Sequence, residues 1–490
     1  MSTSATSIEL KPCPLYIDGK PVVSRGPKDV QYNPATGEPV AEIPRTTPEE
    51  VSAAVEAANK AFSSWSRTPV LQRCRVLFQY RDILEKHAQV LIALITEENG
   101  KTLDEARGSF QRGIECVEFA CSAPTLMMGE TVDQVGSGVD GWSTRNPIGV
   151  CVGITPFNFP FMVPLWMFPM AIACGNTFVL KPSDKVPRTA VRLVELAHEA
   201  GLPAGVLNLV HGAKSTVDSL LTDPRVKAVS FVGSSAVARY IYHTAANNGK
   251  RVQALGGAKN HSVVLPDADM KSTVAAILGS GFGCGGERCL ATSVVVAVGE
   301  VADPLVKELV RAADNLNVGA GCEVKTQMGP VISDEAKKRI LGYIDLGEKE
   351  GATLARDGRK DPVARGNGYF VGPTILDNVN PNSRVAKEEI FGPVLSVIRV
   401  KTLSEALAVI GNSEYGNAAS VFTRSGGAAR EFAQNVGAGM VGINVGVPAP
   451  VAFFPFAGWK NSFFGDLHAL GKDSVRFYTE QRVVTCRWPD

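Results

Sequence analysis

The sequence contains no Cys-x-x-Cys pair, no run of like charges and no long uninterrupted apolar stretch. The most apolar region, residues 157–174, is interrupted by Pro160, Pro164 and Pro169 and includes Asn158. We therefore expect a buried loop and helix there, not a membrane span.

The ten cysteines and six histidines lack metal-ligand spacing, which predicts that no metal is bound. Lys and Arg are spread evenly and the net charge is +1, so we expect no nucleic-acid or membrane partner. Small molecules are the expected ligands.

What is present is a long, compact, glycine-rich chain. With 490 residues, of which 45% are hydrophobic and 20% charged, it exceeds the size of one hydrophobic core, so we expect two or three domains. Residues 1–10 resemble neither a secretory signal nor an organelle presequence, which predicts a cytoplasmic protein. A mitochondrial-matrix form whose presequence has been removed is the alternative.

Short β-rich runs alternate regularly with helical patterns, which predicts an α/β fold with doubly wound parallel sheets. A second alternating series starts after Asp267-Ala268-Asp269. We therefore expect two lobes that meet near residue 260. The expected strands are 150–154, 177–180, 206–210, 228–232, 294–298, 395–400 and 418–422, and the expected helices are 47–68, 71–99, 164–174, 188–200, 215–221, 235–248, 304–314, 404–410 and 428–435.

Two β-rich segments, residues 141–146 and 477–486, fit neither lobe. We interpret them as strands of a small extension used in subunit contact, and a surface hairpin without a partner is the alternative. The expected domains are residues 1–135 with 150–258 for the first lobe, 259–460 for the second, and 136–149 with 470–490 for the extension.

The loop Gly285-Gly286-Glu287-Arg288-Cys289 joins a helical pattern to a strand pattern. Its glycines let the backbone approach a ligand closely. A thiolate is a strong nucleophile, and a neighbouring cation such as Arg288 lowers the pKa of a thiol. Cys289 is therefore the candidate nucleophile, ahead of Cys284, which has no adjacent Arg. An unreactive loop cysteine is the alternative.

Six motifs, in order and spacing, resemble those of the aldehyde dehydrogenase superfamily over nearly the whole chain. The resemblance implies that family's fold, with a Rossmann-like NAD-binding first lobe, a catalytic second lobe and an oligomerisation extension that builds a homodimer or homotetramer. The motifs are Thr155-Pro156-Phe157-Asn158-Phe159-Pro160, Lys181-Pro182-Ser183-Asp184, Phe231-Val232-Gly233-Ser234, Leu255-Gly256-Gly257, Glu287-Arg288-Cys289 and Glu388-Glu389-Ile390-Phe391-Gly392-Pro393.

The resemblance also implies the site. Cys289 is the nucleophile, and Asn158 with the backbone amide of Cys289 forms the oxyanion hole; alone, Asn158 could equally be a loop-capping amide. Glu389 holds the nicotinamide ribose, and the carboxylate of Asp184 near the adenosine ribose favours NAD over NADP. Without the resemblance, Asp184 is a candidate N-cap before Arg188. The implied NAD-binding residues are Thr155, Phe157, Lys181, Asp184, Lys185, Gly233, Ser234, Gly256, Glu389 and Phe391.

One departure narrows the function. Most hydrolytic relatives carry a water-activating Glu directly before Leu-Gly-Gly, but this chain has Ala254, and residues 251–265 contain no carboxylate. Without that base, release of the acyl group to the thiol of coenzyme A is favoured. Glu287 is a substitute base under the alternative reading, a hydrolytic enzyme that releases a free acid.

Three stretches resemble the acylating methylmalonate-semialdehyde dehydrogenases, which also take malonate semialdehyde: residues 157–171, 256–261 and 462–468. The resemblance implies that Arg112 and Arg288 bind the substrate carboxylate, for which planar guanidinium groups are suited. Taken alone, Arg112 could be an exposed helix residue paired with Glu115 or Glu118.

The products implied are propionyl-CoA and acetyl-CoA, formed with loss of CO2. The choice between the two semialdehydes stays open, as does the choice between valine, inositol and β-alanine catabolism. A non-catalytic protein with this fold is a further alternative, and the presence together of Cys289, Asn158 and Glu389 favours the enzyme.

Overall fold

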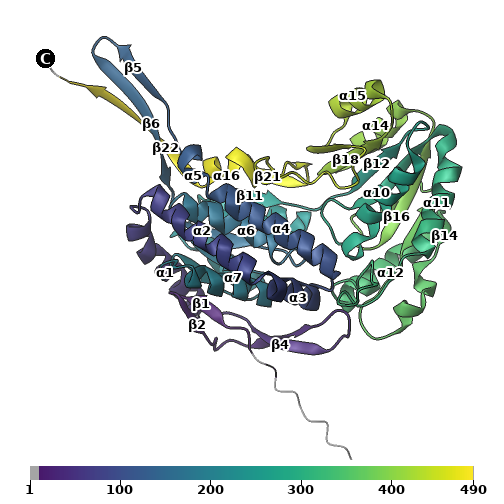
Figure 1. Ribbon diagram of the computed structural model, residues 1–490, viewed down its shortest axis with the longest axis horizontal. Helices are drawn as coiled ribbons and strands as arrows, with labels where there is room; N and C mark the ends of the chain where they lie inside the picture. The colour runs from purple at the N-terminus through teal and green to yellow at the C-terminus, as the bar shows by residue number, and fades with distance from the viewer. Residues whose placement is uncertain (1–9, 11, 489–490) are drawn as a thin grey trace, which may run out of the picture.

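The computed structural model describes residues 10 and 12–488, so the expectations for residues 1–9 and the last two residues of the extension lie outside the described part. Two α/β lobes lie side by side, and a narrow three-stranded sheet projects from the first lobe and carries the C-terminus (Figure 1). The predicted fold class is confirmed. Among the described residues, no helix is long and apolar enough to cross a membrane.

The first lobe is built on an eight-stranded sheet with the order β2-β1-β9-β8-β7-β10-β11-β21. Its five central strands are parallel, and the pairs β1–β2, β1–β9 and β11–β21 are antiparallel. The strands are β1 (Leu15–Ile17), β2 (Lys20–Val22), β7 (Val150–Ile154), β8 (Thr177–Lys181), β9 (Leu207–Leu209), β10 (Val226–Val232), β11 (Arg251–Leu255) and β21 (Phe463–Gly465). The helices are α1 (Pro48–Trp65), α2 (Val70–Lys86), α3 (Ala88–Asn99), α4 (Leu103–Ala120), α5 (Ala123–Leu126), α6 (Met162–Ala173), α7 (Pro187–Glu199), α8 (Lys214–Thr222), α9 (Ser235–Asn247) and α16 (Gly471–Phe477).

The second lobe has a seven-stranded sheet with the order β14-β15-β16-β13-β12-β18-β19, in which β14 alone is antiparallel to its neighbour. The strands are β12 (Asn260–Val264), β13 (Thr292–Val298), β14 (Thr353–Arg356), β15 (Thr374–Asp377), β16 (Val394–Val400), β18 (Ala418–Phe422) and β19 (Met440–Ile443). The helices are α10 (Met270–Phe282), α11 (Ala302–Asp314), α12 (Asp334–Lys349), α13 (Arg384–Lys387), α14 (Leu403–Gly411) and α15 (Gly426–Asn435). Short two-stranded pairs are β3 (Lys28–Tyr32) with β4 (Pro39–Pro44) and β17 (Tyr415–Gly416) with β20 (Trp459–Lys460).

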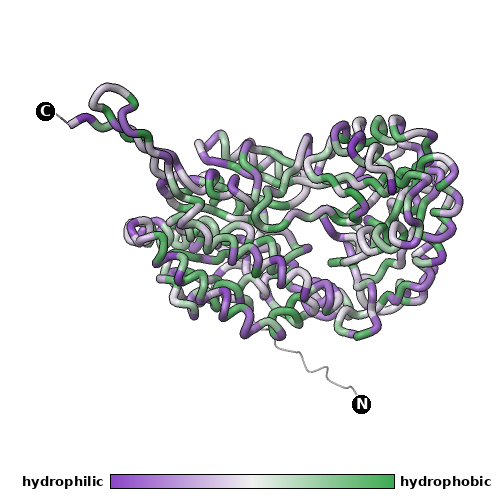
Figure 2. The backbone as a smooth tube through the Cα atoms, turned by 45° about the horizontal axis from the view of Figure 1, so that its top comes forward, coloured by the Kyte–Doolittle hydropathy of each residue, from purple (hydrophilic) through white to green (hydrophobic). Residues whose placement is uncertain are grey.

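Each main sheet is covered on both faces, which explains why its strands are apolar without alternation. In β7, Val150, Val152 and Ile154 belong to one core cluster, while Cys151 belongs to the cluster on the opposite face. Figure 2 shows the hydrophobic segments running inside both lobes, with hydrophilic segments gathered on their outer surfaces.

The structure departs from the expected elements in three places. The helix expected over 71–99 is two helices, because the chain leaves helical geometry at His87 (φ −97°, ψ 11°). The extension contains β5 (Thr131–Gly136), β6 (Val139–Pro147) and β22 (Thr479–Arg487), so a boundary at residue 136 assigns β5 wrongly to the first lobe. The segment expected to belong to the extension from residue 470 onward begins instead with α16, whose Val475 and Phe477 are buried in the core of the first lobe.

The two sheets separate between Leu255, the end of β11, and Asn260, the start of β12. The carboxyl ends of β7, β8, β10 and β11 therefore face the second lobe, and ligands of open α/β sheets bind at such ends. Residues of the motif loops that follow these strands line one pocket together with Cys289, from the loop before β13.

Candidate active site

The loop that carries Cys289 is held in an unusual backbone conformation. Cys284, Gly285 and Gly286 all have positive φ, at 52°, 60° and 72°, a region that favours glycine. At Gly286 a β-carbon would lie 2.3 Å from the backbone of Gly392, so no side chain fits there. The turn brings Cys289 to the boundary between the lobes, where it lines both a cavity of about 530 Å³ and one of about 860 Å³.

Asn158 lies directly beside the thiol. Its Nδ2 donates to the backbone oxygen of Glu287 at 3.0 Å and lies 3.6 Å from Sγ of Cys289. The fold therefore brings together Asn158 and Cys289, the two residues that the resemblance implies are catalytic. A carbonyl carbon bonded to the thiol would place its oxygen near this amide, which is the position that an oxyanion donor needs.

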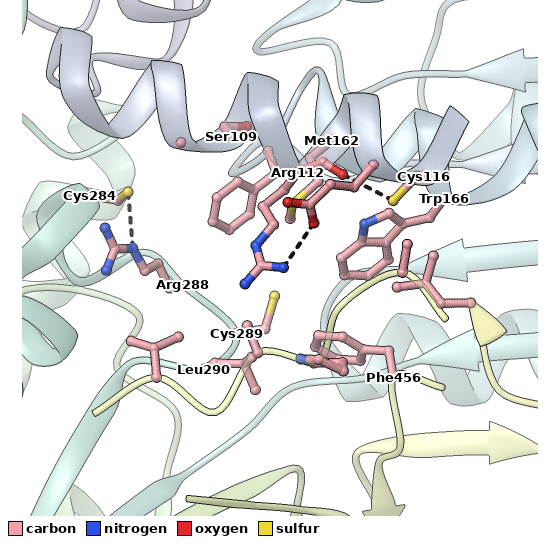
Figure 3. Close-up of a pocket in the computed structure, with 18 of the residues that line it drawn as sticks. Ser109, Arg112, Cys116, Met162, Trp166, Cys284, Arg288, Cys289, Leu290 and Phe456 are labelled. Atoms are coloured by element: carbon pink, nitrogen blue, oxygen red, sulfur yellow. Dashed lines mark hydrogen bonds and ion pairs between the residues drawn. The ribbon is translucent and has the colours of Figure 1, made fainter. Parts of the chain in front are cut away.

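The reason that the sequence suggested for the reactivity of Cys289 is wrong. The guanidinium of Arg288 does not face Cys289, because its Nε contacts Sγ of Cys284 at 3.1 Å (Figure 3). Burial raises the pKa of the Cys289 thiol, and the hydrogen bond from Asn158 and the charge of Lys101 oppose that rise. Arg288 and Cys289 are adjacent in the sequence, but consecutive side chains in a loop can point in different directions, and these two do.

The smaller cavity, called here the substrate pocket, contains both predicted arginines. Arg112, on α4, extends toward Cys289 in Figure 3 and donates to Oε2 of Glu115 at 2.9 Å. Arg288 additionally donates to the backbone oxygen of Gly279 at 3.0 Å and pairs with Glu105 at 3.4 Å. The pairing of Arg112 with Glu115 that the sequence suggested is therefore present inside the pocket, not on an outer helix face.

The rest of the substrate pocket is mostly apolar, and its wall includes the rings of Trp166 and Phe456, whose centroids lie 4.9 Å apart. Its three carboxylates already have cationic partners. Those pairs are Asp104 with Arg107, Glu105 with Arg288 and Glu115 with Arg112. Other apolar residues of the wall are Phe159, Met162, Leu290, Val447 and Leu470.

The larger cavity, called here the cofactor pocket, is lined by eight of the ten residues that the resemblance implies for NAD: Thr155, Phe157, Lys181, Gly233, Ser234, Gly256, Glu389 and Phe391. Asp184 and Lys185 are not among its lining residues. Asp184 instead accepts a hydrogen bond from the amide of Gly212 at 3.1 Å, and Lys185 pairs with Glu335 at 3.7 Å.

The N-cap interpretation of Asp184 is wrong. The N-cap of α7 is Val186, without a side-chain hydrogen bond, so Asp184 does not cap that helix. Oδ1 of Asp184 also lies 3.5 Å from Nζ of Lys181, which lines the cofactor pocket, so its place beside the adenosine ribose stays a prediction.

The cofactor pocket suits a dinucleotide. Ser234 is the N-cap of α9 and makes no side-chain cap hydrogen bond, so the first amides of that helix are available to a phosphate. At Gly256, a β-carbon would lie 2.7 Å from Oγ of Ser235, so this part of the pocket wall has room for glycine but not for a residue with a side chain. Glu389 accepts from the amide of Ala258 at 2.9 Å, and burial raises the pKa of its carboxyl to about 7.

The sequence interpretation missed several residues that hold the site. Asn260 and Asn417 each donate from Nδ2 to the backbone oxygen of Cys289, at 2.8 and 2.9 Å. The amine of the buried Lys101 donates to the backbone oxygen of Asn158. Asn417 and Lys101 come from distant parts of the chain and lie in ordinary turn sequences, so no local signal marks them.

Comparison with known proteins adds three findings. A family model described as the aldehyde dehydrogenase family matches residues 24–484. Malonate-semialdehyde dehydrogenase 1 of Geobacillus thermodenitrificans is 57% identical over 96% of this chain and 98% of its own length. Malonate-semialdehyde dehydrogenase of Halalkalibacterium halodurans is 54% identical over the full length of both chains.

Two solved structures have the same architecture. Methylmalonate-semialdehyde dehydrogenase of Oceanimonas doudoroffii superposes with a TM-score of 0.97 at 51% identity, covering 98% of this chain and 99% of that one. A Sinorhizobium meliloti 1021 protein, solved in complex with NAD, superposes with a TM-score of 0.97 at 46% identity, with the same coverage.

Proposed function

The chain belongs to the aldehyde dehydrogenase family, and within it we propose an NAD-dependent, coenzyme A-acylating enzyme that oxidises methylmalonate semialdehyde to propionyl-CoA and malonate semialdehyde to acetyl-CoA. Relatives named for both semialdehydes support this substrate class, and the relative solved with NAD supports the cofactor. Because the curated relatives are bacterial proteins, we propose a cytoplasmic location and not a mitochondrial matrix.

The reaction begins at Cys289, whose thiolate attacks the aldehyde carbon from the junction of the two pockets. Nδ2 of Asn158 and the backbone amide of Cys289 receive the oxyanion, and a donor in such a position contributes about 3 kcal/mol. NAD, when bound, supplies the acceptor for the hydride that leaves this carbon. Glu389 and the N-terminus of α9 are the groups that would hold the cofactor. The chain is left carrying the acyl group as a thioester.

The carboxylate of the substrate is bound by Arg112, whose guanidinium faces Cys289 within the substrate pocket. Once the thioester has formed, the bond to that carboxylate breaks and releases CO2, and the electron pair moves to the carbon next to the thioester carbonyl. Protonation of that carbon gives the propionyl or acetyl group.

The observation that carries the acylating proposal is that, among the described residues lining the two pockets, every carboxylate other than Glu389, which is assigned to the cofactor, is paired with an arginine. Ala254 is fully buried within β11, between Phe231 and Phe464 of the adjacent strands. The three carboxylates of the substrate pocket are paired with arginines. Glu287 lines neither pocket, and its Oε2 accepts from the amide of Ile332 at 3.1 Å. The thiolate of coenzyme A, which needs no general base, then removes the acyl group.

The experiment is to measure NADH formation from each semialdehyde with NAD, with and without coenzyme A, and to identify the acyl product. We expect turnover to require coenzyme A and to yield propionyl-CoA or acetyl-CoA. Equal turnover without coenzyme A, giving a free acid, would support the hydrolytic alternative. In that case the variant Glu287→Gln would show whether Glu287 activates the water.

A further inference from the structure

Lys101 is a buried lysine that the proposed reaction leaves unused. It follows Gly100, the left-handed C-cap of α3 (φ 87°), and precedes Thr102, the N-cap of α4. Its side chain is 2% exposed. Among the described residues no carboxylate forms an ion pair with its amine within 4.0 Å, although buried charges are normally paired.

The amine of Lys101 is directed at the oxyanion residue. It donates to the backbone oxygen of Asn158 and lies 4.4 Å from the ring centroid of Phe159. The side-chain amide of Asn158 is held on its other side by the backbone oxygen of Glu287 at 3.0 Å. Asn158 is thus fixed at both its main chain and its side chain, with one amide directed at the thiol of Cys289.

The backbone of Lys101 is itself held by the second lobe. The amide of Leu103 donates to the oxygen of Gly321 at 3.2 Å, and a β-carbon at Gly321 would lie 2.0 Å from the oxygen of Lys101. Gly321 lies in the segment between α11 and α12. The same segment contains Ile332, whose amide donates to Oε2 of Glu287 in the loop that carries Cys289. One segment therefore sets the position of Lys101 and of that loop together.

The charge of Lys101 also acts on the site. It lowers the pKa of the Cys289 thiol, against the larger effect of burial, and it lowers the pKa of the Glu287 carboxyl, which burial raises to about 8. Glu389 opposes Lys101 by raising the pKa of the thiol. The other charged groups that line the two pockets around Cys289 are Arg112 with Glu115, Arg288 with Glu105, Asp104, Lys181, Lys214 and Arg339.

We propose that Lys101 is a positioning residue for the acylation step. It holds the Asn158 peptide so that the side-chain amide meets the oxyanion, and it supplies a fixed positive charge that favours the thiolate and the oxyanion over their neutral forms. The inference rests on the proposed nucleophile, Cys289, and is independent of whether coenzyme A or water releases the acyl group.

The test compares Lys101→Met and Lys101→Gln with Lys250→Met. Lys250 is a matched control because its buried amine donates to two backbone oxygens, those of Asp223 and Val226, in the first lobe. Two quantities are measured: the pH dependence of iodoacetamide alkylation at the Cys289 peptide, and single-turnover NADH formation. Alkylation requires neither semialdehyde nor coenzyme A, so it reports on Lys101 even if the proposed substrate is wrong.

For Lys101→Met we expect the alkylation midpoint to rise by about one pH unit and the acylation rate to fall by about 10- to 100-fold. Lys101→Gln keeps an N–H for the Asn158 oxygen without the charge, so it should show the same midpoint shift with a smaller loss of rate. Lys250→Met should match the wild type in both. A wild-type midpoint and rate in folded Lys101→Met, or a wild-type midpoint in Lys101→Gln if the Met variant does not fold, overturns the proposal.

Discussion

Cys289 lines both the substrate pocket and the cofactor pocket, so its sulfur is the proposed meeting point of substrate and cofactor. We expect Cys289→Ser to reduce NADH formation by at least about 10³-fold, because a hydroxyl in the same place is a far weaker nucleophile. Binding of NAD, followed by fluorescence, should be retained since the cofactor pocket is otherwise intact. The exposed Cys322, changed to Ser, is the control. Residual activity within tenfold of the wild type would exclude Cys289 as the nucleophile.

Arg112 should determine the preference for an aldehyde that bears a carboxylate. For Arg112→Met we expect kcat/KM for malonate semialdehyde to fall by about 10- to 100-fold, the loss typical of a charged hydrogen-bonded contact. The value for propanal, which has no carboxylate, should change little. Arg107→Met is the matched control, because Arg107 lies on the same helix but outside the substrate pocket. Equal losses for both aldehydes would mean that Arg112 has a structural role only.

At the residue scale, the sequence could identify members of the site but not their directions. Cys289 and Asn158 belong to recognisable motifs, and the structure brings them together. Arg288 is adjacent to Cys289 in the sequence, yet its Nε contacts Sγ of Cys284 and not the nucleophile. Asp184 precedes α7, yet it accepts from the amide of Gly212 and does not cap that helix. Such partners are set by tertiary packing, which local sequence does not contain.

At the scale of elements, α7 depends on a residue from another helix. Since α7 has no N-cap side chain of its own, Glu98 of α3 accepts from the amides of Arg188 and Thr189, both at 3.0 Å. We expect Glu98→Ala to lower the free energy of unfolding by about 1–3 kcal/mol, the cost of leaving buried donors unpaired. The measurement is urea denaturation. Glu97→Ala, which removes an exposed pair with Arg188, is the control and should cost less than about 1 kcal/mol.

The loss in Glu98→Ala should also depend on pH. Burial raises the pKa of Glu98 to about 7, above its ordinary value of 4.5. The folded state therefore binds the proton more tightly than the unfolded state, and this contribution to stability declines as pH rises from 4.5 through 7. The destabilisation by Glu98→Ala should accordingly be larger at pH 5 than at pH 8. A difference that is constant between these pH values would contradict the assigned shift.

Elements with a buried face were predictable, and elements without one were not. The strands of both main sheets are apolar runs that sequence periodicity detects. β5 was missed because all six of its residues are exposed, so no core pattern marks it. The break between α2 and α3 was missed because the helical spacing of apolar residues continues across His87.

At the scale of the whole molecule, the extension exposes apolar side chains on a sheet of three strands. A sheet of this size is marginal without a covering layer, and exposed apolar patches mark interfaces. We propose that this sheet pairs with another copy of the chain, giving a homodimer or homotetramer. The exposed residues are Val132, Val135, Trp142 and Val483 on its strands, with Trp488 directly after the end of β22.

We expect the double variant Trp142→Asp, Val483→Asp to sediment as a monomer or smaller assembly than the wild type, because charges replace apolar contacts on this surface. Val90→Asp is the control, since Val90 is also an exposed apolar residue but lies on α3. A wild-type protein that sediments as a monomer at micromolar concentration would refute the proposed assembly.

The two-lobe plan could be predicted because strands and helices alternate in two long series. The return of β21 to the first sheet could not, because a strand of three residues has too little pattern to stand out. Its pairing joins Phe463 and Phe464 to Leu255 and Ala254, about two hundred residues earlier in the chain.

That pairing has a consequence for biosynthesis. At about 5–20 residues per second, a ribosome needs roughly 10–40 s to extend the chain from the end of β11 at Leu255 to Gly465. During that interval the nascent first lobe presents an unpaired strand edge, the feature that most readily recruits other chains. The fold is thus completed only near the end of translation, and until then this edge of β11 stays open to pairing with other chains.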